Sequence, residues 1–232
     1  MYEINCFKGG TGMKLSNNIH VLQVVGKQVY YPVILHDNNN LVLVDAGLPL
    51  DFEPLSNAIK ACGYEIKDIN KIIITHQDID HIGCVKELLN ISPDIEVMSH
   101  IDEAPYINGG KIPVKLAKMD ATNPFYEQFK AGFDNRRIMI NKELINKEIL
   151  PFCGDVEVIH TPGHTPGHIC LYLKRDKIMI CGDALNIVDG NLTGANPMHS
   201  DNMNDAEKSA QKLMSYDVKI FVTYHGGIYT RV

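Results

Sequence analysis

The sequence lacks any long apolar segment. Uninterrupted apolar runs such as residues 41–44 and 72–74 are far shorter than the ~18–20 residues that a membrane-spanning helix requires. The first residues, MYEINCFKGGTGMK, contain no hydrophobic stretch of the kind found in secretory signals. We therefore expect no membrane association and a cytoplasmic location.

Basic residues are in the minority. The 232 residues include 22 Lys and Arg against 28 Asp and Glu, which gives a formal net charge of −6 with neutral histidines. A protein that wraps nucleic acid normally has a basic patch, and the sequence shows none. Nucleic acid is therefore not an expected partner, and the 45% of hydrophobic and 22% of charged residues are typical of a globular domain.

The sequence also lacks a CxxC pair. Its cysteines are scattered, and several lie in apolar runs: Cys6, Cys62, Cys84, Cys153, Cys170 and Cys181. Without a secretory signal they are expected to be reduced thiols that pack as small core residues. A structural zinc knuckle is not expected.

Most of the chain alternates between strand and helix patterns. Short β-branched runs between turn residues predict antiparallel strands at 19–25, 29–36 and 41–44. Apolar spacing then predicts helices over about 55–62 and 82–89, with strands at 71–75 and 95–98. The second half repeats the rhythm, with strands at 156–160, 169–173, 177–181 and 218–222 and a helix over 203–214. The pattern favours the α/β (α+β) class, with two packed sheets and helices on both outer faces.

Residues 101–152 interrupt this pattern with four prolines, a Gly-Gly pair and several aromatic residues. Compact domains rarely tolerate structureless connections beyond ~12–15 residues, so we expect an insertion with short helices near 114–119 and 125–133. Its aromatic residues leave three interpretations open: a pocket wall, a small satellite core or a homodimer contact. We expect one domain over 13–232 that contains this insertion, preceded by a flexible leader at 1–12.

The first chemical cluster is THQDIDH, residues 75–81, between a predicted buried strand and a helix. It holds four side chains that can bind a metal, at the kind of strand end where ligands gather in α/β proteins: His76, Asp78, Asp80 and His81. An acidic helix cap is the alternative, because Asp80 or Asp78 could complement the helix start. Capping explains one or two of the four residues, so the cluster favours a metal site.

Three further features share this placement. The loop HTPGHTPGH, residues 160–168, has Pro-Gly turns that fix His164 between two strands. Asp183 closes an apolar strand in CGDAL, and His225 follows another in TYHGG. A carboxylate at the end of a buried strand must accept hydrogen bonds or bind a cation, because burying it alone is costly.

THQDIDH, HTPGHTPGH, CGDAL and YHGG, in this order and spacing, resemble the metallo-β-lactamase superfamily of metallohydrolases from about Ile19 onward. The resemblance implies a four-layer αββα sandwich with a metal site at the edge of the sheets. It implies two divalent metal ions, with these ligands: His76, Asp78 and His164 for the first, Asp80, His81 and His225 for the second, and Asp183 bridging both. Asp80 is also the expected catalytic residue that orients a metal-bound hydroxide, and Asp45 in VDAG would support the site from beneath.

One position departs from the family motif H-x-H-x-D-H, because Asp78 stands where the family has a second His. With Asp80, Asp183 and a bridging hydroxide, Asp78 makes the ligand set one charge unit more negative than usual. Zinc is expected from the family, but this harder ligand set favours iron or manganese. It also weakens Lewis acidity, so the pKa of the bound water should lie above that of the usual set.

The leading functional hypothesis is a hydrolase that attacks a small ester-, lactone- or thioester-like substrate with a metal-bridging hydroxide. The alternative is a carboxylate-rich diiron redox or oxygen-sensing protein, since flavodiiron relatives also carry a carboxylate at the position of Asp78. Those enzymes contain a flavodoxin domain, whereas seven residues follow His225 here, so the hydrolase is preferred. A nuclease, as among RNA-processing relatives, is disfavoured by the acidic balance.

Other polar residues have competing interpretations. Tyr106 and Tyr224 are candidate substrate-binding residues that would donate to an oxyanion, although packing explains them as well. Three lysines of the insertion face either an anionic substrate or solvent: Lys111, Lys115 and Lys118. Six histidines match no ligand position. Two are expected to be structural, and four to be surface or turn residues: His160 and His168, then His20, His36, His100 and His199.

Overall fold

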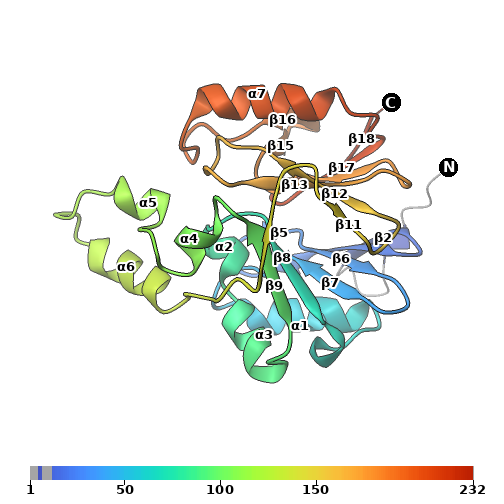
Figure 1. Ribbon diagram of the computed structural model, residues 1–232, viewed down its shortest axis with the longest axis horizontal. Helices are drawn as coiled ribbons and strands as arrows, with labels where there is room; N and C mark the ends of the chain where they lie inside the picture. Colours follow the sequence, from blue (N-terminus) through green and yellow to red (C-terminus); the bar gives the residue numbers. More distant parts are fainter. Residues whose placement is uncertain (1–4, 7–11, 232) are drawn as a thin grey trace.

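Two β-sheets pack face to face between outer helices in the computed structural model (Figure 1), which describes residues 5–6 and 12–231. Most of the predicted leader, residues 1–12, lies outside the described residues. None of the helices in the described ranges has the length and apolarity needed to cross a membrane.

The first sheet contains the strands of the N-terminal half. In spatial order they are β1 (Asn5–Cys6), β2 (Gly12–Ser16), β3 (Ile19–Leu22), β6 (Val33–His36), β7 (Leu41–Val44), β8 (Lys71–Ile74), β9 (Glu96–His100) and β10 (Lys142–Leu144). The strands from β1 to β7 pair antiparallel, and those from β7 to β10 pair parallel. The carboxyl ends of β7, β8 and β9 therefore lie at one edge of this sheet.

The second sheet contains the strands of the C-terminal half. In spatial order they are β11 (Ile149–Leu150), β12 (Val156–His160), β13 (Ile169–Leu173), β14 (Ile178–Ile180), β17 (Ile220–Thr223) and β18 (Gly227–Thr230). Strands β14 and β17 are parallel, so their carboxyl ends also share an edge. Two short ribbons complete the strands: β4 (Val24–Val25) with β5 (Val29–Tyr30), and β15 (Leu185–Val188) with β16 (Asn191–Gly194).

Helices cover the outer face of each sheet, which gives the predicted αββα order. The first sheet is covered by α1 (Phe52–Ala61) and α3 (Val85–Ile91), with the short helices η1 (Ile66–Asp68) and α2 (Ile79–Ile82) nearby, and the second sheet by α7 (Met203–Met214). Leu55 and Leu88 pack with the outward side chain of Leu43. Leu213 of α7 packs with Cys170.

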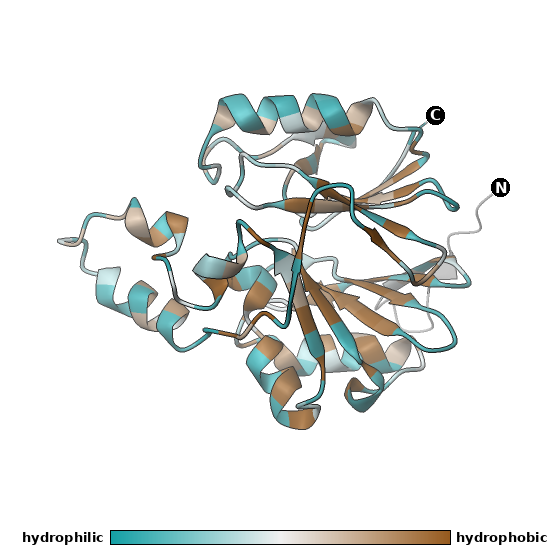
Figure 2. Cartoon of the chain, viewed as in Figure 1, coloured by the Kyte–Doolittle hydropathy of each residue, from teal (hydrophilic) through white to brown (hydrophobic). Residues whose placement is uncertain are grey.

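Strand alternation places the central core between the two sheets. Val42 and Val44 point toward the second sheet, whereas Leu43 between them points toward the helices. Ile169 and Leu171 complete the same inner layer from the other side. Figure 2 shows the strands as the most hydrophobic part of the chain and α7 with a hydrophilic outer side. Since both faces of each central strand are buried, the strands read as continuous apolar runs.

The insertion forms an arm that projects from one end of the sandwich (Figure 1). It carries α4 (Ala104–Ile107), α5 (Val114–Ala117) and α6 (Tyr126–Asp134). Helices α5 and α6 correspond to the helices predicted near 114–119 and 125–133, and their ends differ from the predicted ends by at most two residues. No residue of α6 is buried, although it carries Phe129 and Phe133.

The predicted strand at 29–36 is divided in the structure. Residues 29–30 form β5 in a separate ribbon with β4, and the main strand resumes only at Val33. Pro32 lies between them, and a proline has no N–H with which to continue a sheet ladder. The predicted strand at 19–25 divides in the same way into β3 and β4, and the helix at 82–89 divides between α2 and α3.

Candidate metal centre

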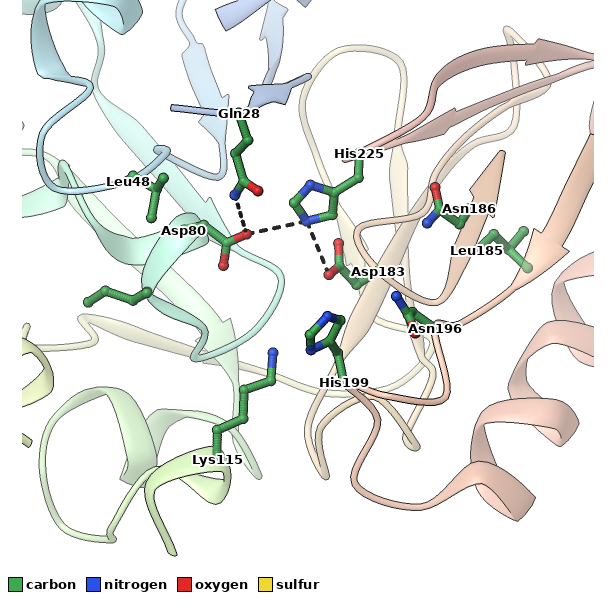
Figure 3. A pocket seen from close by; sticks show the side chains of 11 residues that line it. Gln28, Leu48, Asp80, Lys115, Asp183, Leu185, Asn186, Asn196, His199 and His225 are labelled. Atoms are coloured by element: carbon green, nitrogen blue, oxygen red, sulfur yellow. Dashed lines mark hydrogen bonds and ion pairs between the residues drawn. The ribbon is translucent and has the colours of Figure 1, made fainter. Parts of the chain in front are cut away.

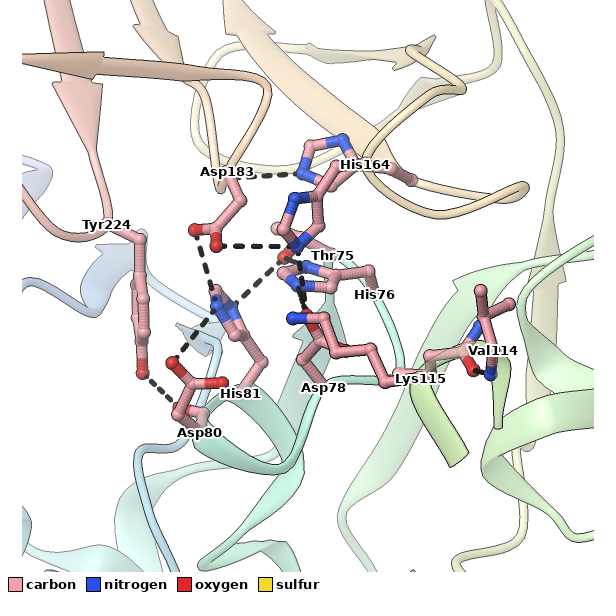
Figure 4. A network of polar contacts seen from close by, with 12 residues as sticks. Thr75, His76, Asp78, Asp80, His81, Val114, Lys115, His164, Asp183 and Tyr224 are labelled. Atoms are coloured by element: carbon pink, nitrogen blue, oxygen red, sulfur yellow. Dashed lines mark hydrogen bonds and ion pairs between the residues drawn. The ribbon is translucent and has the colours of Figure 1, made fainter. Parts of the chain in front are cut away.

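The loop that follows β8 and the short helix α2 carry four of the predicted ligands. β8 is buried, and the chain leaves it at Thr75, so residues 75–78 run along the edge of the sheet before α2 begins. His76 and His81 are fully buried, and Asp78 is nearly so. In Figure 4 these side chains point toward one centre, with Asp183 and His164 facing them from the second sheet.

His164 reaches the site from the Pro-Gly loop between β12 and β13. Thr161 N donates to His168 O (2.8 Å), which closes the base of this loop. A Cβ at Gly163 would lie 2.1 Å from Ala206 N, and Gly163 has a positive φ of 136°, so only glycine fits against α7 here. Asp201 N donates to His164 O (3.0 Å), which ties the loop to the start of α7.

Asp183 and His225 come from the shared edge of the second sheet. Asp183 follows β14 and His225 follows β17, so parallel pairing of the two strands brings their ends together. Asp183 N donates to Nε2 of the buried His168 (3.0 Å). Nε2 therefore carries no proton, and Nδ1–H faces Thr161 Oγ1 (2.8 Å). This fits the structural role predicted for His168, because the ring fixes the backbone that presents Asp183.

The first group of side chains is centred on Asp78. Oδ2 of Asp78 lies 3.1 Å from His76 Nε2 and 2.9 Å from His164 Nε2. The Lys115 ammonium of α5 contacts the same oxygen. The ligand atoms of His76, Asp78 and His164 lie within 4.8 Å of one another, close enough to bind one cation.

The second group lies on the other side of Asp183. Its members are Asp80, His81 and His225, whose ligand atoms also lie within 4.8 Å of one another. Asp183 connects the groups: its Oδ2 lies 3.5 Å from His164 Nε2 and 3.4 Å from His225 Nε2, and its Oδ1 lies 3.4 Å from His81 Nε2. His225 Nε2 also lies 3.3 Å from Asp80 Oδ2.

Buried oxygen atoms orient two of the imidazoles. Asp45 Oδ2 accepts from Thr75 Oγ1 (2.8 Å) and lies 2.9 Å from His81 Nδ1, so His81 Nδ1 donates to Asp45 and Nε2 is the nitrogen that faces the site. Thr75 Oγ1 in turn lies 3.0 Å from His76 Nδ1, which aims His76 Nε2 at the same centre. Asp45 thus lies beneath the predicted ligands and controls which nitrogen each ring presents.

Clustering shifts the proton affinities of these groups. Burial would raise the pKa of Asp78, but the adjacent His76 and the hydrogen bond to His164 hold it well below its usual range. Burial would likewise raise the pKa of Asp183, and the neighbouring His81 and His225 lower it strongly. Burial and the nearby His81 lower the pKa of His76 to about 4. The two carboxylates are therefore ionised and His76 is neutral at neutral pH, which are the protonation states that ligate metal. Burial would lower the pKa of His81 and that of His225, but the neighbouring carboxylates raise both, that of His225 to about 9, so these two rings release a proton when they bind metal.

Two central atoms are suited to bind a cation. Among the described residues, His81 Nε2 and Asp183 Oδ1 are buried without a partner in hydrogen-bonding geometry. Buried polar atoms normally have one, and a cation between a buried carboxylate oxygen and an imidazole nitrogen would stabilise both. The donor set and these orphaned atoms therefore fit divalent metal ions.

The chain matches the family model of the metallo-beta-lactamase superfamily over residues 26–225. It belongs to this superfamily. The predicted family and fold are thereby confirmed, and with them a metal-dependent hydrolase as the class of enzyme.

Relatives and solved structures agree with this membership. The chain is 28% identical to the probable metallo-hydrolase YflN of Bacillus subtilis, over 94% of this chain and 88% of that protein. It is 26% identical to a hydroxyacylglutathione hydrolase of Francisella philomiragia, over 81% of this chain but only 58% of that enzyme. The metallo-beta-lactamase family protein TTHA1429 of Thermus thermophilus has the same fold, with a TM-score of 0.75 and 18% identity over 94% of this chain and 76% of that one.

The predicted ligands border a cavity of about 480 Å³ (Figure 3). Asp183 and His225, whose side chains are 14% and 28% exposed, line it together with Asp80, whereas His76 and His164 are buried behind them. The other walls are mostly polar and come from several elements: Gln28, Leu48, Ile79, Lys115, Leu185, Asn186, Asn196 and His199. A substrate therefore approaches from the side of the second group.

The three lysines of the insertion have different surroundings. Lys115 lines the cavity and contacts Asp78. Lys118 forms an ion pair with Asp201 at the start of α7, and Lys111 lies over the ring of Tyr106, 5.0 Å from its centroid. Of these lysines, Lys115 is the one placed to meet an anionic group.

The two tyrosines predicted to contact substrate lie elsewhere. Tyr106 lines a separate pocket within the arm, away from the residues that line the catalytic cavity. The Tyr224 hydroxyl is buried beneath α2, where it donates to Asp80 O (2.7 Å) and accepts from Gly47 N (3.1 Å). Its ring packs on His81, with centroids 3.9 Å apart. Tyr224 thus supports two of the predicted ligands from behind.

Two histidines expected at the surface are buried. His20 lies in β3, where its ring packs against the rings of His36 and Tyr64, and His100 stacks on His160 with ring centroids 4.2 Å apart. Burial lowers the pKa of both His20 and His100 to about 4. His160 Nε2 lies 2.9 Å from Pro166 O, in keeping with the structural role expected for it.

A buried residue that the sequence analysis did not single out connects the two ligand loops. Glu103 Oε1 accepts from the backbone N–H (2.8 Å) and the side-chain amide (2.9 Å) of Gln77, and its Oε2 accepts from Gly167 N (2.7 Å). Burial raises the pKa of Glu103 to about 7, against the effect of these donors. Gln77 Oε1 accepts from Val114 N (2.7 Å), which extends the network to α5 and the arm.

Proposed function

We propose that the protein hydrolyses a small ester, lactone or thioester with two divalent metal ions held by the predicted ligand set. The observation that carries the proposal is the convergence of seven imidazole and carboxylate side chains, from loops far apart in the sequence, on one wall of a polar cavity. Three carboxylates of this set offset most of the four positive charges of two such ions. A thioester is favoured among the three bonds, because three of the relatives found are hydroxyacylglutathione hydrolases.

The roles proposed for the carboxylates follow from which of them face the cavity. When bound, divalent ions supply a Lewis acid for the carbonyl oxygen and a nucleophile derived from water. Asp80 and Asp183 face the cavity, where Asp80 would orient the attacking water and Asp183 would fix the spacing between the two groups. The amides of Asn186 and Asn196 lie across the same cavity and offer donors to the polar groups of a substrate.

Lys115 adds a positive charge to the wall of the same cavity. Its ammonium contacts Asp78 and lines the cavity, so it offers an anionic substrate group a partner there. Electrostatic stabilisation of developing negative charge is usually a large catalytic term, and an ammonium in a partly closed cavity contributes to it.

A substrate panel with a chelation control tests the proposal. Purified protein is assayed against a hydroxyacylglutathione thioester, an aryl acetate and a small lactone, before and after removal of metal with a chelator. We expect hydrolysis of at least one compound, its loss on chelation and its return with zinc, manganese or iron. No turnover by any metal-loaded form would refute the proposed activity.

The carboxylate at position 78 keeps the diiron alternative open. Asp78 contacts both His76 and His164 in the first group, so this part of the site offers a hard oxygen ligand where the superfamily has an imidazole. Protein isolated aerobically is analysed by metal mass spectrometry and visible spectroscopy. Two irons with an oxo-bridge absorption and no hydrolysis would favour a redox or oxygen-sensing role.

A further inference from the structure

An apolar groove lies beside the catalytic cavity and takes no part in holding metal. It runs between the loop at 48–51 and helix α6 of the arm, with a volume of about 670 Å³. The residues that line it are mainly apolar, among them Leu48, Pro49, Leu50, Ile79, Phe125 and Phe129. This size lies within the ~300–1,000 Å³ that small-molecule sites occupy.

The groove adjoins the cavity. Leu48 and Ile79 line both spaces, and Ile79 directly precedes Asp80 in α2. Figure 3 shows Leu48 close to Asp80 at this end of the cavity. A molecule whose reacting carbonyl lies at Asp80 and Asp183 can therefore extend past Leu48 into the groove.

Three of the apolar side chains that line the groove are largely exposed. Leu50 is 75% exposed, Phe125 59% and Phe129 49%, and α6 buries none of its residues. Single exposed apolar residues are ordinary, but a contiguous set next to a polar cavity is typical of a binding surface. The arm thus presents an apolar wall that the fold itself does not require.

We propose that this groove binds the apolar tail of the substrate, so that the enzyme prefers an ester or thioester with an alkyl or aryl chain of several carbons. The proposal rests on the hydrolase function proposed above and names its substrate class. The catalytic cavity takes the polar end with the scissile bond, while Leu50, Phe125 and Phe129 cover the tail. A second copy of the chain is the competing occupant, but the wall that the groove shares with the cavity at Leu48 and Ile79 favours a ligand that occupies both spaces.

One glycine that lines the groove can be replaced by a larger residue that would fill it. Gly132 lines it from α6, and a Cβ built there meets no atom within 4 Å. Gly132→Leu therefore introduces a large side chain without a backbone clash, and leucine is a better helix former than glycine. The matched control is Ala131→Leu on the same helix, because Ala131 is exposed and lines neither the groove nor the cavity.

The experiment compares metal-loaded wild type, Gly132→Leu and Ala131→Leu on two thioester series. One series varies the acyl chain from two to ten carbons with a constant thiol, and the other varies the thiol with a constant acetyl group. For wild type and Ala131→Leu we expect kcat/KM to rise about four-fold per methylene in one series, which corresponds to ~0.8 kcal/mol for each buried CH₂. Gly132→Leu should flatten that dependence.

Binding without turnover separates the two proposals. Titration calorimetry with decanoate and acetate measures whether the groove holds an apolar chain, in wild type and in both variants. Tighter binding of decanoate that Gly132→Leu abolishes, without hydrolysis of any thioester of these series or of any compound in the panel above, would support the groove as an apolar site and refute the hydrolase. Hydrolysis with equal kcat/KM at every chain length and equal binding of both acids would refute the groove. So would a wild-type dimer in sedimentation that Gly132→Leu dissociates.

Discussion

Glu103 Oε1 accepts hydrogen bonds from both the backbone and the side-chain nitrogen of Gln77, at 2.8 and 2.9 Å. Gln77 lies between His76 and Asp78, and Glu103 Oε2 accepts from Gly167 in the loop that carries His164. A single buried carboxylate therefore fixes the distance between two loops that both supply the first group of side chains. Groups that hold ligand loops in this way are worth about 10- to 100-fold in metal affinity.

Replacing Glu103 should weaken metal binding. In Glu103→Gln an NH₂ group stands where an oxygen accepted, so either Gly167 N–H loses its partner or both donors of Gln77 do. We expect at least a ~10-fold loss of affinity for one metal ion, measured by chelator competition on the apoprotein. Asp102→Asn is the control, because Asp102 is adjacent and largely exposed. A lowered melting temperature with unchanged affinity would show that Glu103 only stabilises the fold.

Asp183 is the side chain through which the two groups meet. Asp183→Ala removes the carboxylate that approaches His81, His164 and His225, so at most one metal ion should remain per chain. Activity should fall by more than ~100-fold, the upper range for the loss of groups that merely support a metal ligand. Metal mass spectrometry on the dialysed protein is the measurement, with the exposed Asp94→Ala as control. Two ions at full stoichiometry would contradict the bridging role.

Asp78 should determine which metal the first group prefers. Asp78→His restores the imidazole of the family motif and softens the ligand set, so the share of zinc should rise in protein reconstituted with equal zinc, manganese and iron. Lys115 contacts this carboxylate and would then face an imidazole beside a cation, so the variant is also made with Lys115→Gln. An unchanged metal profile in both backgrounds would mean that Asp78 does not ligate.

The predicted ligands could be found from the sequence because each follows a buried strand within a few residues. Strand pairing then brings the ends together, as β14 and β17 do for Asp183 and His225. Glu103 could not be found in this way. Its partners Gln77 and Gly167 lie 26 and 64 residues away, and no short motif surrounds it in the insertion.

The sequence patterns failed to predict some strands for a related reason. The ribbon of β15 and β16 is largely exposed, so its side chains do not alternate between apolar and polar as those of a half-buried strand do. The two halves of the predicted strand at 29–36 both have strand character, and only the missing N–H of Pro32 separates them. The local sequence pattern therefore predicts the core strands, whereas exposed ribbons and long-range polar contacts can be identified only in the folded structure.

His20 should make the fold sensitive to acid. Burial, the nearby His36 and Lys14 on the paired strand lower the pKa of His20 to about 4 from an ordinary value of 6.5, and the ring of Tyr64 packs against it. The unfolded chain therefore takes up a proton at a higher pH than the folded chain. The contribution of a neutral His20 to stability is fully present above pH 6.5 and is lost as the pH falls toward 4.

His20→Phe keeps an aromatic ring in β3 and removes the titration. Between pH 7 and 4.5 the free energy of unfolding of the variant should fall less steeply than that of wild type, by roughly 1–2 kcal/mol over the range. Urea unfolding at a series of pH values, on protein freed of metal in every sample, gives this slope. The exposed His199→Phe serves as the control and should follow the wild-type slope. If His20→Phe also follows that slope, His20 is not the group whose protonation destabilises the sheet.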